Sequence, residues 1–302
     1  MTGIALALVA LVGFSANILV ARVGGARVPI AAGYFVAVVV NVAAAALMLV
    51  ADLAWRTEPL RWDAWGAVLF ALSGFFSTYL GRFLMYESAT RLGPARTSAF
   101  QVASPLFTFV IALAFLGEVL TPVALAGMVT TGCGLLLISL TGMGARPVAR
   151  EMGRRGSWLR SAWLLGLGSS IAYAVGNVMR GAGVREWNEP IAGVLIGAAS
   201  GIACHFALSR GHASMLRSLR TAHRGGLALF AVSGVLTIVA QVCTIAAMKV
   251  TPVSLVALIT LCTPLLVFPA SYFLLGNDER INARTLAGGA LSIAGIAMIV
   301  LH

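Results

Sequence analysis

The stretch LGPARTSAFQVASPLFTF, residues 92–109, is apolar enough for a membrane helix, yet it carries Pro94 at its start and Pro105 eleven residues later. The chain repeats this design in VTPVSLVALITLCTPLLVF, residues 250–268, with Pro252 and Pro264. A proline inside a helix lacks the N–H that bonds to the carbonyl four residues earlier, and its ring crowds that carbonyl. Pro105 and Pro264 therefore predict two membrane helices that are kinked at their centres, either to shape packing or to act as gating hinges.

The composition places these helices in a polytopic membrane protein. The 302 residues are 60% hydrophobic and 10% charged, with a mean hydropathy of +0.95. A bilayer core is crossed by about 20 apolar residues of helix, and open strands cannot satisfy their backbone in lipid. The sequence predicts an all-α bundle of ten transmembrane helices: Gly3 to Val23, Pro29 to Ala51, Ala64 to Ala89, Ala95 to Leu116, Pro122 to Leu140, Trp163 to Met179, Ile191 to Leu208, Gly225 to Met248, Val253 to Leu275 and Ala283 to Leu301.

The formal net charge of +11 does not indicate nucleic acid, because the basic residues fall in loops, where they orient the helices. Most of them lie on one side when alternate loops are counted. The other side carries only Arg56, Arg61, Arg180, Arg185 and Lys249. The positive-inside rule then places both termini outside the cytoplasm.

The two halves of the chain resemble one another. Four pairs of segments align: Arg91 to Pro94 with Lys249 to Pro252, Ser104 to Leu106 with Thr263 to Leu265, 14–20 with 174–180, and 117–134 with 278–295. Each half holds five helices, so the second enters the membrane in the opposite orientation, as in secondary transporters. The sequence predicts an inverted repeat with units 1–140 and 162–302, joined by a basic linker at 141–161.

The segments MYESATRLGPARTSAFQVASPLFTFVIALAFLGEVLT, 85–121, and AAMKVTPVSLVALITLCTPLLVFPASYFLLGNDERI, 246–281, carry a family resemblance. In both, a small-residue helix end is followed by a turn, a helix with a central proline, and a glycine and glutamate. The chain resembles EamA-type members of the drug/metabolite transporter superfamily, including bacterial amino-acid and metabolite exporters. The resemblance implies alternating access, a cavity lined by the first, third and fourth helices of each repeat, and a bacterial inner membrane, with periplasmic termini by the charge count.

The third predicted helix holds the strongest candidate for a binding site. Phe75, Tyr79, Arg82 and Tyr86 are spaced by four, three and four residues, which places them on one face of an α-helix. Arg82 lies about 13 Å of helix away from Arg91, too deep for a loop charge, and buried arginines face a partner or a cavity. We expect Arg82 to attract a substrate carboxylate beside Tyr79 and Tyr86; the alternative is a packing arginine paired with Gln101 or a carbonyl.

Other polar residues in the predicted helices have a structural and a functional interpretation. Asn17 and Asn177 occupy equivalent places in the two halves and could bind substrate or bond between helices; Gln101, Gln241 and Tyr173 are further substrate-binding candidates. His205 could relay a proton or be structural. Glu118 and Glu279 are predicted to cap the fifth and tenth helices. The glycines of GxxxG in the seventh helix predict close packing, and tryptophans beside loops predict interfacial anchors: Trp55, Trp62, Trp65, Trp158 and Trp187.

These features predict a secondary transporter that exports small metabolites, such as amino acids, with membrane lipid and the solute as its partners and with no cofactor or metal. The alternatives are a multidrug or cationic compound exporter and a transporter of another carboxylate-bearing metabolite. A drug-cation antiporter would use a glutamate in the first helix, which has no acid. An intramembrane enzyme would need a nucleophile with its base or a metal cluster, and no such motif is present. A packing scaffold would leave the inverted repeat unexplained.

Overall fold

A computed structural model describes residues 2–28, 30–92, 94–141, 157–208, 219, 222–275 and 283–301. These residues contain helices and no strand, and ten spans are long and apolar enough to cross a membrane. The all-α prediction is confirmed. The helices that need no interruption are α1 (Thr2–Gly25), α2 (Ile30–Trp55), α7 (Pro122–Thr141), α8 (Ser157–Glu186), α9 (Pro190–Leu208), α11 (Arg224–Val250) and α14 (Ala283–Val300).

The other three spans are broken. The third consists of α3 (Ala64–Ser73), a π-helical segment η1 (Gly74–Gly81) and α4 (Arg82–Leu92). The fourth is split into α5 (Pro94–Gln101) and α6 (Ser104–Leu116), and the ninth into α12 (Val253–Leu261) and α13 (Thr263–Leu275). Pro105 and Pro264 each lie at the second residue of the later helix. The predicted kinks are therefore complete breaks between two helices. Each proline lies in the first turn of the later helix, where its missing N–H has no hydrogen-bond partner to lose.

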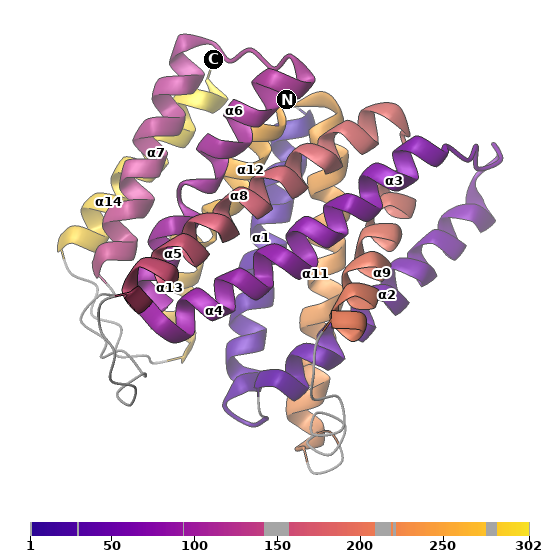
Figure 1. Ribbon diagram of the computed structural model, residues 1–302, viewed down its shortest axis with the longest axis horizontal. Helices are drawn as coiled ribbons and strands as arrows, with labels where there is room; N and C mark the ends of the chain where they lie inside the picture. Colours follow the sequence, from indigo (N-terminus) through magenta and orange to yellow (C-terminus); the bar gives the residue numbers. More distant parts are fainter. Residues whose placement is uncertain are drawn as a thin grey trace.

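The packing of α7 against α14 shows the symmetry of the repeat directly (Figure 1). Gly127 faces the backbone of Gly295, and Gly134 faces that of Gly288. The Thr131 hydroxyl lies 3.5 Å from the carbonyl of Ser292, and the Ser292 hydroxyl lies 3.4 Å from the carbonyl of Thr131. These are equivalent residues in the sequence repeat, and such reciprocal contacts mark a twofold relation.

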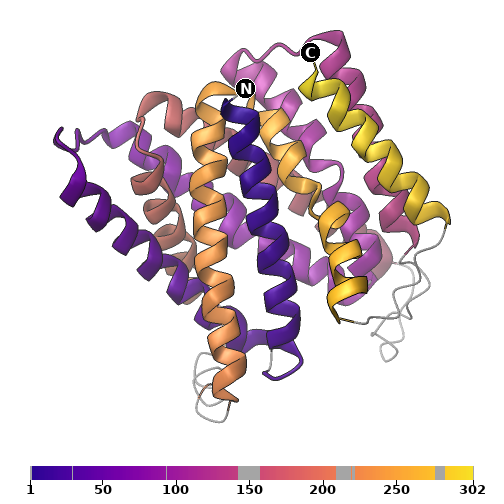
Figure 2. The ribbon, with the colours of Figure 1, turned by 180° about the vertical axis from the view of Figure 1, so that it is seen from behind.

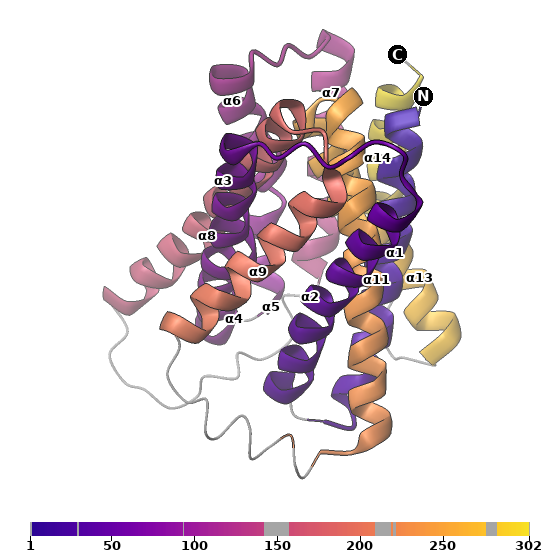
Figure 3. The same ribbon diagram turned by 90° about the vertical axis from the view of Figure 1, so that its right-hand side faces the viewer.

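The remaining helices form two groups that each mix both repeats and that pack on one another where α2 meets α9, α12 meets α6 and α11 meets α8. The first group, named here the α1 group, contains α1, α2, α11, α12 and α13; the second, the α8 group, contains α8, α9, α3, η1, α4, α5 and α6. Helix α1 packs along α11 (Figure 2), and the equivalent α8 packs along α3, η1 and α4. In Figure 3 the labels α3, α4, α8 and α9 lie toward one side and α1, α11 and α13 toward the other.

Helix α9 lies close to the third span through its GxxxG glycines, as predicted. A Cβ on Gly193 would clash with the Phe70 ring, and one on Gly201 would clash with Thr78. Gly197 meets the backbone of Gly74 at the start of η1. The glycine face of α9 therefore receives the Phe70 ring, the Thr78 side chain and the backbone of Gly74 from the third span.

Both chain ends lie at the same end of the bundle, here named the terminal face (Figure 1). This arrangement follows from ten crossings. Of the predicted linker, residues 157–161 instead begin α8, and 142–156 lie outside the described residues, as does Glu279. Helix α8 also extends past the predicted end at Met179, so Arg180 and Arg185 lie in a helix rather than in a loop.

Candidate functional site

Arg82 lies directly after the π-helical segment and is partly buried. Its Nη1 donates a hydrogen bond of 2.7 Å to the hydroxyl of Tyr34 in α2. Its guanidinium carbon lies 5.0 Å from the centre of the Tyr34 ring, within the range of a cation–π contact. Gln101, offered by the sequence as a packing partner, bonds elsewhere. Arg82 thus joins the α8 group to the α1 group through an uncharged hydroxyl.

Two further tyrosines surround this arginine. Tyr86 lies one turn later, with its ring centre 6.2 Å from that of Tyr34. Tyr173 comes from α8, and its ring lies against the backbone of Gly81. Tyr34, Tyr86 and Tyr173 thus all lie around Arg82. The structure therefore brings together three residues that the sequence proposed for substrate binding, namely Arg82, Tyr86 and Tyr173.

A second arginine belongs to the same cluster. Arg180 lies in α8, two helical turns after Tyr173, on the same face. Its Nη2 donates to the Ser77 hydroxyl of η1 at 2.5 Å, and its Nη1 lies 3.4 Å from Oδ1 of Asn177. Ser77 lies five residues before Arg82 in the third span, so Arg180 reaches the same part of that span. We name these residues the two-arginine cluster: Arg82, Arg180, Tyr34, Tyr86, Tyr173 and Ser77.

The two-arginine cluster has no acidic member among the residues that the structure describes. The described ion pairs use other arginines: Glu87 pairs with Arg91, Glu118 with Arg185, and Asp52 and Glu189 with Arg56. Arg82 and Arg180 bond instead to hydroxyls and an amide. Two guanidinium charges inside a membrane bundle are expensive to keep without a negative partner. Such an arrangement favours the binding of an anion.

The interrupted backbone beside the cluster is held by two serines of α8. The Ser169 hydroxyl donates to the carbonyl of Gly81, which ends η1, at 2.8 Å. The Ser170 hydroxyl donates to the carbonyl of Phe100, just before the break in the fourth span, at 2.6 Å. Gln101 donates through Nε2 to Ser169 at 2.7 Å. The breaks in the third and fourth spans are thus compensated by neighbouring side chains, as backbone at membrane depth requires.

Other residues proposed from the sequence lie outside the cluster. Tyr79 stacks on Phe83 at 6.2 Å and packs beside Phe75, and its predicted common face with Arg82 stays a prediction. The 100° step assumed there does not hold within a π-helix. Asn17 accepts a hydrogen bond from Ser233 of α11. Gln241 lies partly buried in α11, and the ring of His205 lies 6.3 Å from that of Tyr34.

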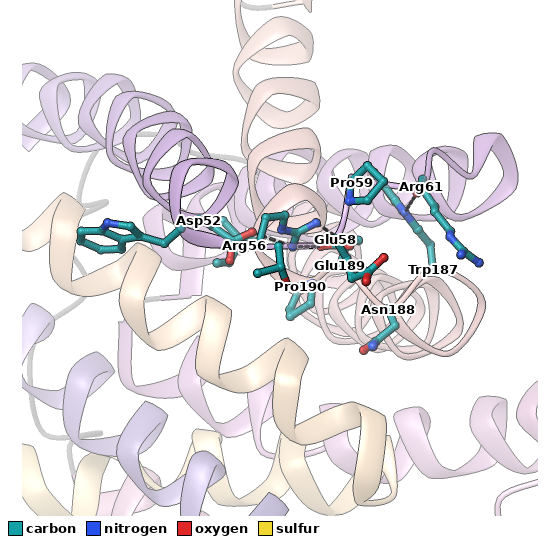
Figure 4. Close-up of a pocket in the computed structure, with 12 residues that line it drawn as sticks. Asp52, Arg56, Glu58, Pro59, Arg61, Trp187, Asn188, Glu189 and Pro190 are labelled. Carbon is teal, nitrogen blue, oxygen red and sulfur yellow. Dashed lines mark hydrogen bonds and ion pairs between the residues drawn. The ribbon is translucent and has the colours of Figure 1, made fainter.

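An open cavity of about 840 Å³ lies at the terminal face, between the ends of α2 and α8 and the starts of α3 and α9 (Figure 4). Arg56 crosses it, donating to both oxygens of Glu189 at 2.9 and 2.8 Å and pairing with Asp52 at 2.6 Å. The bond to Glu189 raises the pKa of the Arg56 guanidinium above its ordinary value. This ion pair links α2 of the α1 group to α9 of the α8 group.

The wall of this cavity includes Trp187, which is only 4% exposed. Its indole N–H donates to the carbonyl of Arg61 at 2.7 Å, and its ring centre lies 5.2 Å from that of Trp62. The prediction that Trp187 is an interfacial anchor is therefore wrong. It is a core residue that holds the start of the third span against the end of α8.

Glu118 also differs from its prediction. Gly117 ends α6 in the left-handed conformation, at φ 63°, and α7 begins only at Pro122, with the Thr121 hydroxyl accepting from the N–H of Ala124 at 3.1 Å. Glu118 instead accepts from the N–H of Val253 at 2.7 Å and pairs with Arg185 at 2.5 Å. It is 6% exposed. Glu118 thus caps α12 in the other repeat, an interaction that no local pattern predicts.

Tyr34, Ser77 and Arg180 were not among the residues predicted for the site. Arg180 was counted as a loop charge because the apolar run stops at Met179. The repeat held a signal, since the alignment of 14–20 with 174–180 places Arg180 over the apolar Val20. Tyr34 stands among apolar and small residues, and Ser77 is one of several polar residues in its segment. Only the long-range contacts of the fold identify them.

Known proteins share the fold of this chain. A solved structure entitled "Crystal structure of protein" has 19% sequence identity and a TM-score of 0.69, with 99% of this chain and 96% of that chain covered, which shows a shared fold. No curated protein matches this sequence. The profile of the EamA-like transporter family matches residues 1–140 and 160–301, the two predicted repeats. With both repeats matched over nearly their whole length, the chain belongs to the EamA-like transporter family, whose members move small solutes across membranes.

Proposed function

We propose that this protein is a secondary transporter that exports small carboxylate-bearing metabolites, such as amino acids, across the bacterial inner membrane. The observation that carries this proposal is the two-arginine cluster, which has no acidic member among the described residues. Arginine binds carboxylates through paired N–H donors. Arg82 is the principal anion ligand in this proposal, and Tyr34, Tyr86 and Tyr173 supply hydroxyls and apolar ring faces.

Alternating access is supported by the two groups of helices. Arg82 and Tyr34 join these groups at one level, and Arg56 and Glu189 join them again at the terminal face. The two levels lie near opposite ends of α2, which begins at Ile30 and ends at Trp55. Movement of the two groups relative to each other would open one junction while the other stays closed. The breaks before Pro105 and Pro264 are the proposed hinges of this movement.

The export of cationic drugs is the second transport hypothesis, and the site gives it less support. A cation would face two arginines, and no carboxylate of the described chain contacts the two-arginine cluster. The proposal includes neither an enzyme reaction nor a cofactor. Periplasmic termini, taken from the loop charges, belong to the same proposal and are tested by a fluorescent fusion at His302 that folds only in the cytoplasm.

Counterflow into liposomes tests the function. Purified protein is reconstituted with unlabelled solute inside, and uptake of labelled neutral, acidic, basic and aromatic amino acids and of a quaternary cation is measured. Saturable uptake of amino acids that is lost in Arg82→Ala, with the variant still folded, would support the proposal. Uptake of the quaternary cation alone would refute it and favour the drug-export alternative.

A further inference from the structure

We propose that the substrate of the two-arginine cluster carries two negative charges, as a dicarboxylate, an acidic amino acid or a phosphomonoester does. This inference rests on the proposed function and narrows it. Arg82 would hold one charged end of the solute and Arg180 the other. Neutral amino acids, which carry one positive and one negative group, would be poorer substrates.

The described residues of the site carry two positive charges and no negative charge. Arg180 bonds to Ser77, five residues before Arg82 in the third span, and Tyr173 of the same helix lies against Gly81 beside Arg82, so the two guanidinium groups belong to one site. The carboxylates that pair with arginines in the described chain do so outside the cluster, with Arg56, Arg91 and Arg185. A bound monoanion would leave one positive charge uncompensated in a medium of low polarity, whereas a dianion would neutralise both.

The contacts of the two arginines also favour an anionic ligand. Each guanidinium carries five N–H donors in a fixed plane. Arg82 uses Nη1 for Tyr34, and Arg180 uses its two terminal nitrogens for Ser77 and Asn177. Each of these acceptors is uncharged, so an anion would form stronger bonds to the same guanidinium groups. Tyr34 and Ser77 orient the arginines without neutralising them.

The residues that contact the two arginines are spaced along the helices. Tyr173, which interacts with Arg82, lies seven residues before Arg180, a rise of about 10 Å on one face of α8. Across the interface, Ser77 and Arg82 are five residues apart in the third span. The contacts that hold the two guanidinium groups therefore lie at different levels along α8 and the third span. This separation suits a solute whose two charges lie at its two ends.

The α-ammonium group of an amino acid should weaken its binding to this site. The α-ammonium of a zwitterion bound at Arg82 would lie within the field of Arg180, with no carboxylate of the described chain to pair with it. An acidic amino acid carries a second carboxylate that can offset this repulsion. The site therefore favours acidic over neutral amino acids, and a dicarboxylate without an ammonium group over both.

The test uses the full chain in two formats. In detergent, the thermal stability of the protein is measured with succinate, propionate, glycerol phosphate, aspartate, alanine and chloride at equal ionic strength. In liposomes, counterflow of the same organic solutes is measured. Succinate or glycerol phosphate should stabilise the protein at concentrations at least about 10-fold below those needed for propionate or alanine. The two dianions separate dicarboxylate from phosphate specificity.

Arg180→Gln should reduce the affinity for the dianion about 10-fold or more while changing that for propionate about threefold or less, and Arg180→Lys should restore most of the preference. Arg91→Gln is the matched control, because Arg91 is paired with Glu87 outside the cluster. The retained response to propionate shows that Arg180→Gln is folded.

Three results would overturn the inference. Alanine could be transported as well as aspartate and succinate, which would leave the proposed exporter intact and reject only the dianion. Chloride could stabilise the protein as strongly as succinate, or Arg180→Gln could lower both affinities equally. Failure of every carboxylate and phosphate in the counterflow assay would instead refute the proposed function itself.

Discussion

Two helix junctions that are equivalent in the repeat have opposite chemistry. The register that places Asn17 over Asn177 and Arg91 over Lys249 also places Gly13 over Tyr173 and Ala240 over Arg82. Where α1 crosses α11, a Cβ on Gly13 would lie 3.0 Å from that of Ala240. Where α8 crosses the third span, Tyr173 interacts with Arg82. The crossing of α1 and α11, named here the closed junction, is filled by direct packing. The crossing of α8 and the third span, named here the polar junction, holds the two-arginine cluster.

The backbone shows the same difference. Helix α11 runs from Arg224 to Val250 without a break, whereas its counterpart contains the π-helical segment η1. A π-helical turn accommodates an additional residue and often occurs at functional sites. The duplicated scaffold therefore provides two similar crossings, and only one has a widened backbone and charged side chains. The consequence is an asymmetric site within a nearly symmetric bundle.

The largest effect should come from removing the charge at the polar junction. Arg82→Ala should lower counterflow on the order of 100-fold, because it removes charge-assisted bonds to the solute. The unfolding temperature should stay the same or rise, since a buried cation without an acidic partner is lost. Fluorescence-monitored size exclusion measures the folded fraction. A folded Arg82→Ala protein with full transport would contradict the assignment.

Overpacking the closed junction should lower the stability of the protein and leave solute binding unchanged, the opposite of the result expected for Arg82→Ala. Gly13→Val should destabilise the protein by roughly 1–3 kcal/mol, because its side chain would be forced against Ala240. The protein that remains folded should bind solute with unchanged affinity. Gly132→Val in α7 is the control, since a Cβ at Gly132 meets nothing within 4 Å. Equal losses of thermal stability in the two variants would argue against the close contact.

The sequence predicted the parts of this molecule that depend on composition and periodicity. The ten spans, the inverted repeat and the breaks near Pro105 and Pro264 all follow from apolar runs, internal alignment and the missing proline N–H. Arg82 was identified by its depth in an apolar segment. These features are local or repeated, and each can be deduced without knowing which helices are neighbours.

The missed features depend on helix packing or on local departures from α-helical geometry. The π-helical segment η1 has an ordinary apolar sequence, so the spacing of Tyr79 and Arg82 was interpreted with a constant α-helical step that does not hold there. Glu118 binds the start of α12, more than a hundred residues away in the chain, and was assigned to its own helix. Arg180 was hidden by the apparent end of an apolar run, although the following residues continue α8 for nearly two turns.

A smaller effect should distinguish the tyrosines of the polar junction. Tyr34→Phe removes the hydroxyl that accepts from Arg82 and keeps the ring contacts, so the apparent affinity for solute should fall about fivefold. Tyr79→Phe tests the original prediction that Tyr79 binds substrate. Its position between Phe75 and Phe83 leads us to expect a change of less than about twofold. Concentration-dependent counterflow measures both, and a larger effect of Tyr79→Phe would restore that residue to the site.

The smallest effects should separate the two equivalent asparagines. Asn17 bonds to Ser233, so Asn17→Ala should cost about 0.6 kcal/mol of stability, the usual value for a polar bond between membrane helices, and leave transport unchanged. Asn177 contacts Arg180, so Asn177→Ala should instead raise the half-saturating solute concentration about threefold, because Arg180 loses a fixed orientation. Thermal unfolding and counterflow are measured on both variants. If Asn17→Ala impaired transport as much as Asn177→Ala, both crossings would contribute to the site, and the closed junction between α1 and α11 would have to open during the transport cycle.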